Sequence, residues 1–309
     1  MSSASLAPTL PVPGSDNLRG GMWMLFSVVT ASAMTLAARE LTSGMGSRMV
    51  VFLRAAVVVV ALAPLLAVPR FRRMMRFSRP WLHLARGGLI GVSTQLGFYS
   101  IAHMPLAAAT VLFFTAPIFA TLLAGPVNGE KVGPRRWAAV GAGFLGALIV
   151  LRPGAGDFEP AAVAALVSSL MFAAALSMSR GLAEADGAPP AYVSSVVLTA
   201  LVGLPLALPV WSLPGDAAGR AVLAVLMLTS TARGIGDLQA YRLGEASVTG
   251  VISHLRLVLI GAAAWWLFGE VPGAATWIGG AVIVASTLYI ARRAALRRRA
   301  PPPPPETPA

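Results

Sequence analysis

Residues 111–152 read VLFFTAPIFATLLAGPVNGEKVGPRRWAAVGAGFLGALIVLR, and residues 251–292 read VISHLRLVLIGAAAWWLFGEVPGAATWIGGAVIVASTLYIAR. Each stretch runs from an apolar segment through a Gly-Glu corner and a tryptophan into a second apolar segment that ends at an arginine. Aligned without a gap, 140 residues apart, they match at several landmarks: Val111, Glu130, Gly133, Trp137 and Arg152 correspond to Val251, Glu270, Gly273, Trp277 and Arg292. Such an internal duplication of apolar segments is typical of membrane transporters built from repeats.

The composition of the chain indicates a membrane protein. Of its 309 residues, 56% are hydrophobic and 12% are charged, whereas a soluble domain carries about 25% charged residues. The apolar residues come in blocks of about 17–25, the length at which a helix crosses roughly 30 Å of hydrocarbon. The blocks lack the alternation of polar and apolar residues that a transmembrane β-barrel requires. The sequence therefore predicts an all-α protein that crosses the membrane several times.

Ten transmembrane helices are expected, separated by short joints, most of which contain Gly or Pro. Their expected ranges are 20–38, 48–68, 81–102, 106–125, 135–151, 160–181, 190–210, 219–241, 246–267 and 274–292.

The distribution of positive charge predicts how these helices are oriented. If the N-terminus is cytoplasmic, the cytoplasmic segments carry sixteen of the 24 Lys and Arg residues, and the outer segments carry four. Lys and Arg gather on the cytoplasmic side of membrane proteins. We therefore expect both termini to be cytoplasmic.

The same orientation gives the duplication a physical meaning. Each copy holds five helices, an odd number, so the second copy must be inserted upside down. We expect two inverted five-helix repeats, residues 20–152 and 160–292, flanked by a cytoplasmic tail of residues 1–19 and a basic, proline-rich cytoplasmic tail of residues 293–309. The Glu130 corner, with Lys131 beside it, would lie inside, and the Glu270 corner outside. Both glutamates are interpreted as residues that cap or brace a joint.

Several short motifs follow one another along residues 20–292. They are Tyr99–Thr110 (YSIAHMPLAAAT), Thr115–Pro117, Gly129–Glu130, Leu151–Pro153, Ala240–Arg242, Ala246–Ser247 and Phe268–Pro272. In their order and spacing the chain resembles the EamA family of ten-helix bacterial permeases, within the drug/metabolite transporter superfamily. It departs from the family pattern where Leu257 corresponds to Pro117, and His254 and Arg256 are more polar than the pattern there.

The resemblance implies two EamA domains with inverted pseudo-symmetry that move small organic solutes by alternating access across the bacterial cytoplasmic membrane. We expect a secondary transporter without a cofactor, and an exporter of amino acids or related metabolites. The alternatives are import of a metabolite such as an S-adenosylmethionine-like compound and proton-coupled drug efflux. From other classes, a membrane-integral enzyme or a channel remains an alternative. The substrate, direction of transport, coupling ion and oligomeric state stay open.

Ionisable residues within the expected spans mark the candidate site, because charge at membrane depth is costly and usually faces a cavity or a partner. Arg256 either contacts a substrate or counter-ion or belongs to a structural ion pair. His254 either packs through hydrogen bonds or relays protons. Arg233 and Asp237 are one helical turn apart. They either neutralise each other or leave Asp237 to pair with Arg256 or to take up a proton.

These charged positions have no counterpart in the first repeat. Ser93, Gly97, Phe114 and Ala116 correspond there to Arg233, Asp237, His254 and Arg256. A scaffold role would more often recur in both copies, so the asymmetry favours a ligand or coupling role.

Uncharged residues add three weaker candidates. Gln95 and Tyr99 share one helix face and either line a pocket or bind neighbouring helices, and Gln239 is a further candidate. We interpret Arg54 and Arg86 as structural, with Arg86 extending toward the lipid headgroups.

No motif for catalysis is found in the chain. Cysteine is absent, and there is no His-Glu-x-x-His, phosphate-binding lysine loop or nucleophile elbow. The sequence therefore predicts no catalytic residue, no metal site and no cofactor. The basic clusters adjoin membrane spans, which favours contact with membrane lipids over nucleic acid. The expected partners are a small-molecule substrate and lipids, with protons as the candidate coupling ion.

Overall fold

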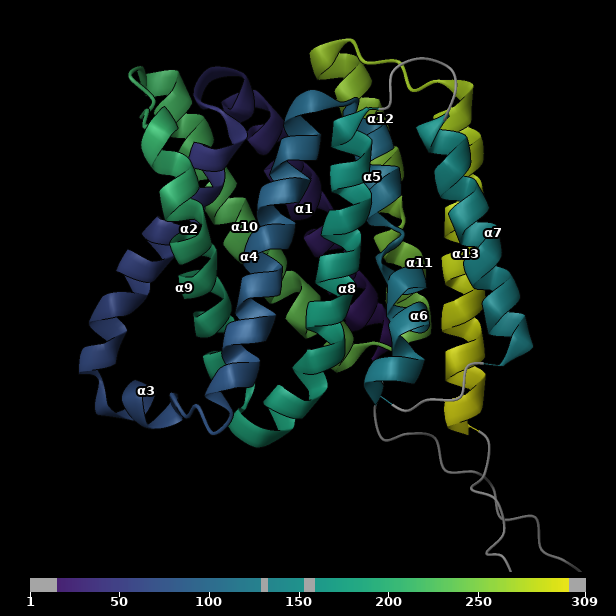
Figure 1. The fold of residues 1–309 in the computed structure, drawn as a ribbon, viewed down its shortest axis with the longest axis horizontal. Coiled ribbons are helices and arrows are strands. Elements are labelled where there is room, and N and C mark those ends of the chain that lie inside the picture. The colour runs from purple at the N-terminus through teal and green to yellow at the C-terminus, as the bar shows by residue number, and fades with distance from the viewer. Residues whose placement is uncertain (1–15, 129–132, 153–158, 300–309) are drawn as a thin grey trace, which may run out of the picture.

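The computed structural model describes residues 16–128, 133–152 and 159–299 (Figure 1). The Glu130 corner with Lys131, Pro153 of the Leu151–Pro153 motif, and the outer parts of both expected tails lie outside this range. The described part is helical and contains no strand. Its elements are α1 (Asn17–Met45), α2 (Ser47–Leu62), η1 (Ala63–Ala67), α3 (Pro69–Met74), α4 (Pro80–His103), α5 (Leu106–Phe113), α6 (Ala116–Asn128), α7 (Pro134–Leu151), α8 (Pro160–Asp186), α9 (Ala188–Ala207), η2 (Leu208–Val210), α10 (Ala217–Leu243), α11 (Ala246–Ser253), α12 (Leu255–Phe268) and α13 (Ala274–Arg299).

The predicted all-α membrane fold is confirmed. Nine segments of the described chain are long and apolar enough to cross a membrane. The tenth expected span is α4, which has 24 residues. It packs against α8, α9 and α2, and it buries Ser93, Gln95 and Ser100 among them. A helix surrounded by protein needs less apolar surface than one that faces lipid, which explains why α4 is not among the nine segments.

Helices from the two halves pack in antiparallel pairs. The side chain of Asn17 at the start of α1 accepts a hydrogen bond of 2.9 Å from the Glu245 backbone N–H beyond the end of α10. Ser100 near the end of α4 donates to the Ala161 carbonyl at the start of α8, at 2.7 Å. In α13, a Cβ added at Gly279 would lie 2.5 Å from the Gly146 carbonyl of α7, so these helices meet backbone to backbone. The α1–α10 and α8–α4 pairs are therefore equivalent antiparallel pairs of the two halves, which is consistent with an inverted duplication.

This pairing defines two faces of the bundle. At the N-terminal face α1, α4, α7 and α9 begin and α13 ends; the short helix α3 lies at the same face, at the bottom of Figure 1. At the opposite face α1 and α4 end and α8, α10 and α13 begin.

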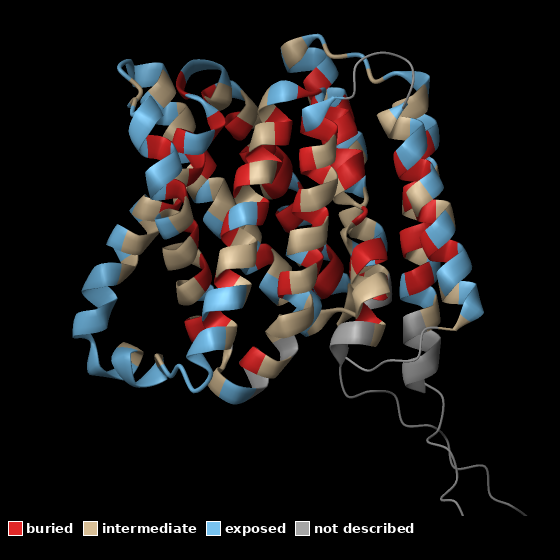
Figure 2. Cartoon of the chain, in the orientation of Figure 1, coloured by how far each residue is buried: buried red, intermediate tan, exposed pale blue. Residues whose placement is uncertain are grey.

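The outer surface of the bundle is apolar. Buried residues concentrate between the helices, and exposed ones on their outward sides (Figure 2). Many exposed side chains are large and apolar, such as Leu145, Leu201 and Leu228. Exposed tryptophans lie near helix ends, as Trp81 does at the N-terminal face and Trp266 at the opposite face. Such aromatic belts mark the two membrane interfaces.

Candidate functional site

Two interrupted helices meet near the centre of the bundle. The fourth span of the first half breaks between α5 and α6, at Phe114 and Thr115, and that of the second half breaks at His254. These breaks correspond in the 140-residue alignment, and the Phe114 and His254 rings stack with their centroids 4.9 Å apart and planes 17° apart. Interrupted helices at membrane depth often form substrate sites in repeat transporters.

The two breaks have different local causes. Pro117 has no N–H to donate to the Phe113 carbonyl, so a regular helix cannot continue there. The corresponding Leu257 does donate, but to the nearer His254 carbonyl at 3.0 Å. The second break therefore follows tightened backbone geometry without a proline, and the sequence alone did not predict it.

His254 is held by contacts on both ring nitrogens. Its Nδ1 lies 2.7 Å from the Gly250 carbonyl, and its Nε2 lies 3.1 Å from the Thr287 hydroxyl of α13. The ring thus joins the helix break to α13 and has no direct contact with the charged residues nearby. A role in proton relay stays a prediction.

The structure brings together three of the predicted charged residues. Arg233 Nε lies 3.5 Å from Asp237 Oδ2 on α10. The second Asp237 oxygen accepts a hydrogen bond from Ser27 of α1. Arg256 of α12 donates to Thr35 of α1 at 2.9 Å, and it lies within electrostatic range of both Arg233 and Asp237. Its Nε is buried and has no hydrogen-bond partner. We call Arg233, Asp237 and Arg256 the charged triad.

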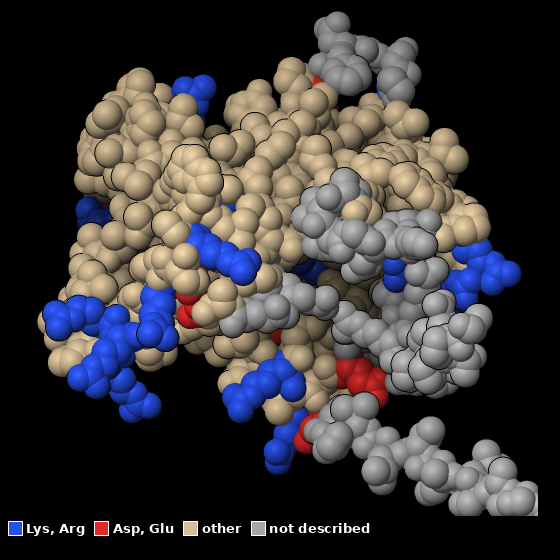
Figure 3. Space-filling model, turned by 60° about the horizontal axis from the view of Figure 1, so that its bottom comes forward, with Lys and Arg blue, Asp and Glu red and all other residues tan. Residues whose placement is uncertain are grey.

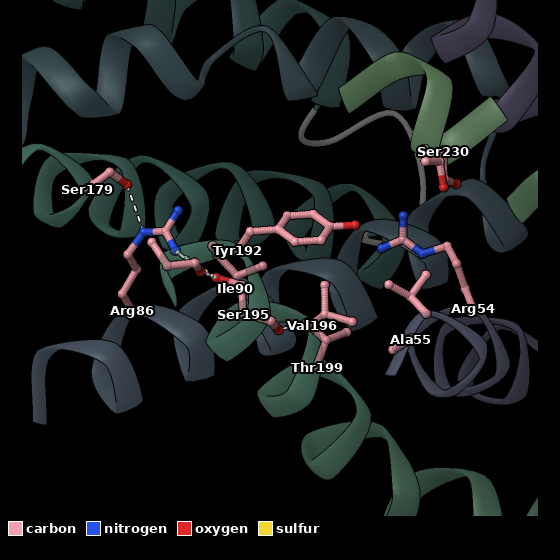
Figure 4. Close-up of a pocket in the computed structure, with 13 residues that line it drawn as sticks. Arg54, Ala55, Arg86, Ile90, Ser179, Tyr192, Ser195, Val196, Thr199 and Ser230 are labelled. Carbon is pink, nitrogen blue, oxygen red and sulfur yellow. Dashed lines mark hydrogen bonds between the residues drawn. The ribbon is translucent and has the colours of Figure 1, made fainter. Parts of the chain in front are cut away.

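A cavity of about 410 Å³ lies between α2, α4, α8, α9 and α10. Figure 4 shows Arg54 and Arg86 at opposite ends of this cavity and the Tyr192 ring between them, with its hydroxyl directed toward Arg54. Ser179, Ser195, Thr199, Ser230 and Thr231 add hydroxyl groups to the lining. We call this the arginine cavity.

The arginine cavity owes its shape to unequal packing of the two halves. Gly87 of α4 admits α9 closely, because a Cβ at Gly87 would lie 2.4 Å from Leu198 Cδ1. The counterpart of α4 in the second half is α10, which packs mainly along α1 and touches α2 and α9 at most marginally. The cavity occupies the space left between α10 and these two helices.

The two cavity arginines have different surroundings. Arg86 donates to the Ser179 hydroxyl at 2.8 Å, the Ser195 hydroxyl at 2.6 Å and the Ala191 carbonyl at 2.9 Å. It therefore points into the bundle, whereas the sequence had suggested a side chain that extends to the headgroups. Arg54 lies over the Phe98 ring at 5.3 Å and within electrostatic range of Arg233. It thus links the cavity to the charged triad.

The remaining predicted residues lie elsewhere. Gln95 and Tyr99 line a second, mostly apolar cavity of about 540 Å³ between α4 and α8. The Gln95 amide nitrogen is buried without a hydrogen-bond partner, and the Tyr99 ring stacks on His103 with centroids 4.2 Å apart. Gln239 is half-buried on α10. The predicted site residues therefore divide between two places.

An ion pair joins helices of the two halves at the opposite face. Arg39 of α1 lies 2.8 Å from Glu270 and also donates to the Ile101 carbonyl at 2.5 Å. The other Glu270 oxygen accepts from the Leu106 backbone N–H at 2.7 Å and so caps the start of α5. Glu270 thus braces this corner and ties α1 to α5 and α12.

A second polar cluster holds the N-terminal face. His83 Nε2 lies 2.9 Å from Asp186 Oδ2, and the Asp186 carboxylate accepts from the Ser78 backbone N–H at 3.0 Å. Hydrogen bonds from Ser78 and His83 lower the pKa of Asp186 from 3.8 to about 2. This cluster ties the end of α8 to the start of α4.

Known proteins are similar to this chain in sequence and in fold. The profile of the EamA-like transporter family matches residues 18–152. A riboflavin transporter of Vibrio cholerae is 31% identical over 280 residues, which cover 88% of this chain and 93% of the relative. The chain belongs to the EamA-like transporter family. It is therefore a multi-pass membrane protein of a bacterial transporter family that carries small molecules.

Other EamA-like relatives differ in what they carry. An S-adenosylmethionine uptake transporter of Rickettsia prowazekii is 28% identical, with 88% of this chain and 92% of the relative aligned. A pseudopaline exporter of Pseudomonas aeruginosa is 25% identical, with 89% and 97% aligned. A crystal structure with 19% identity aligns with 92% of this chain at a TM-score of 0.59 and has the same fold.

Arg54, Arg86 and Tyr192 are the residues of this EamA-like transporter that the sequence analysis did not select. A signal was available for Arg54, because it stands in the middle of an otherwise apolar span, where an ionisable residue suggests function. Tyr192 carried no such signal, because its place beside the arginines depends on how α9 packs.

Proposed function

We propose that this protein is a secondary, alternating-access transporter that binds a small organic metabolite in the arginine cavity. The observation that carries the proposal is a cavity lined by two arginines and several hydroxyl groups, next to a charged triad, in a bundle whose helices are joined at the opposite face by the Arg39–Glu270 ion pair. A channel would need a continuous water path through that face. The relatives are named as transporters, which fits a protein without catalytic activity.

In this proposal the charged triad couples transport to an ion gradient. Arg54 lines the cavity and interacts electrostatically with Arg233. A charge on the substrate would therefore act on the Arg233–Asp237 pair. Proton uptake by Asp237 would free Arg233 and change the balance of charge around Arg256. His254, Gln239, Gln95 and Tyr99 stay secondary candidates.

We further propose that the N-terminal face is cytoplasmic and that the membrane is the bacterial inner membrane. The excess of Lys and Arg on that face supports this orientation (Figure 3). The repeats would comprise residues 20–152 and 160–292, between cytoplasmic tails of residues 1–19 and 293–309. The arginine cavity would then extend from mid-membrane toward the cytoplasm, because Arg86 and Ala191 lie within two turns of that face.

For the direction of transport, we propose export of amino acids or related metabolites. A cavity on the cytoplasmic side is where an exporter loads its substrate. An importer would release its substrate from the same state, so import and proton-coupled drug efflux are the alternatives. The relatives include both an uptake transporter and an exporter.

A metabolite comparison tests the proposal. Cells that express the protein, cells with an empty vector and cells that express Asp237→Asn would be profiled for metabolites in the cytoplasm and the medium. We expect at least one solute to move outward only with the unaltered protein. A solute that moves inward would favour import. No solute difference, with the protein correctly inserted, would contradict the proposal.

A further inference from the structure

The charges at membrane depth do not balance. Within the described spans, Arg54, Arg233 and Arg256 lie away from the Arg39–Glu270 pair, and Arg86 lies within two turns of the N-terminal face, so that four arginines border the interior of the bundle. In the same region the described chain has one carboxylate, Asp237. Ionised side chains at this depth are normally paired, so a surplus of arginine calls for an explanation.

The single carboxylate does not serve the arginine cavity. Asp237 is held by Arg233 at 3.5 Å and by the Ser27 hydroxyl. Arg86 bonds to two hydroxyls and one carbonyl, all of them neutral. Arg54 faces the Phe98 ring. Neither cavity arginine has a carboxylate of the described chain within ion-pair distance, although both border one space of about 410 Å³.

We propose that the substrate is an organic anion whose carboxylate or phosphate group binds between Arg54 and Arg86. This rests on the proposed function and names the charge of its substrate. Guanidinium groups offer forked N–H donors that match carboxylate and phosphate oxygens. The Tyr192 ring between them packs against the uncharged part of the substrate, and its hydroxyl donates beside Arg54 (Figure 4).

A preference for anions would distinguish this chain from its relative, the S-adenosylmethionine uptake transporter. S-adenosylmethionine would add net positive charge beside two arginines that lack a counter-ion, because its sulfonium and ammonium groups outnumber its one carboxylate. A bound anion instead supplies the missing charge. It would also weaken the repulsion between Arg54 and Arg233, which lie within electrostatic range. Binding would thereby act on the charged triad.

Binding of defined probes tests this charge preference. The full-length protein would be placed in nanodiscs of zwitterionic phosphatidylcholine, and its thermal unfolding followed with succinate, phosphoenolpyruvate and inorganic phosphate as anions. Riboflavin serves as the neutral probe, and choline and S-adenosylmethionine as cations. We expect at least one anion to raise the unfolding temperature of the protein and no cation to raise it. Comparing succinate with the phosphates shows whether a carboxylate or a phosphate group is preferred.

Variants connect the effect to the cavity. Arg54→Gln and Arg86→Gln should each weaken the apparent affinity for the anion about tenfold or more, as loss of a charged hydrogen bond implies. Arg54→Lys should keep part of the affinity and shows whether the site still folds. Arg220→Gln removes an exposed arginine at the opposite face and should change nothing.

Four results would overturn the inference. They are stabilisation by the neutral or cationic probes alone, no response to any anion, an anion response that both glutamine variants retain, and an effect seen only when anionic phosphatidylglycerol replaces phosphatidylcholine. The last would assign the cavity to a lipid headgroup. Transport of a neutral or cationic metabolite in the cellular comparison would leave the proposed function intact and refute only the anion preference.

Discussion

At the scale of single residues, α1 supplies the hydroxyls that position the charged triad. Ser27 donates a hydrogen bond to Asp237, and Thr35 accepts one from Arg256. Both Ser27 and Thr35 are buried. From the sequence, Arg233 and Asp237 were expected to lie one helical turn apart, and pairing of Asp237 with Arg256 was one of the alternatives. The sequence did not predict the partners on α1, because the packing of α1 against α10 is not encoded in any local pattern.

Removing either charge should stop transport. We expect Asp237→Asn or Arg256→Ala to reduce transport to the background of empty cells, because the first removes the carboxylate that Arg233 contacts and the second removes a buried charge of the triad. The amount of each variant in the membrane fraction should match that of the unaltered protein. Arg220→Gln is the matched control. Normal transport by both triad variants would remove the charged triad from the mechanism.

The Asp186 cluster should make stability depend on pH at the acidic end. The native pKa of about 2 lies below the ordinary value of 3.8, so the folded state favours the ionised carboxylate. Its stabilising contribution is therefore full above pH 3.8 and is lost as the pH falls toward 2. The unfolding temperatures of the unaltered protein and Asp186→Asn should differ at pH 7 and converge near pH 2 to 3. A constant gap would contradict the assignment.

At the scale of elements, most of the fold could be predicted. The ten expected spans all correspond to helices, because apolar length and Gly or Pro joints are local signals. The expected fourth span, 106–125, is two helices, α5 and α6, and the expected ninth, 246–267, is α11 and α12. Pro117 could have signalled the first break, but nothing comparable marks His254. The short helix α3 in the linker was also not predicted.

Contact between α7 and α13 depends on glycine. Gly279→Ala would put a Cβ 2.5 Å from the Gly146 carbonyl, a backbone atom that cannot move aside alone. We expect a loss of about 1–3 kcal/mol in the free energy of unfolding, as overpacking typically costs. Gly141→Ala on α7 has nothing within 4 Å of the new Cβ and should be neutral or slightly stabilising. The stability of both variants would be measured by thermal unfolding in detergent. Equal stability of the two would contradict close packing between α7 and α13.

At the scale of the whole molecule, the two halves run in opposite directions and pack unequally. Inverted direction follows from an odd number of helices per repeat, so the sequence could predict it. The arginine cavity could not be predicted, because five helices far apart in sequence form it and α10 stands away from α2 and α9. If the two repeats exchanged their packing arrangements, so that the loosely packed half became the tightly packed one, the cavity would open first to one face and then to the other.

The Arg39–Glu270 pair should control access from the opposite face. Glu270→Gln removes the charge that holds Arg39 and weakens the cap on α5. We expect this variant to populate the outward-open state more often and to lower the transport rate. Glu40→Gln, which changes an exposed carboxylate near the end of α1 at the same face, is the control. An unchanged rate and unchanged access from outside would show that the pair is not a gate.

Alternating access to the arginine cavity is measured most directly with one cysteine. The chain has none, so Ser230→Cys would place a single thiol in the cavity lining. A membrane-impermeant thiol reagent would then be applied to right-side-out and inside-out vesicles. We predict rapid labelling from the cytoplasmic side, slow labelling from outside, and faster outside labelling when Glu270→Gln is added. Equally fast labelling from both sides of the single-cysteine protein would indicate an open pore and contradict the account.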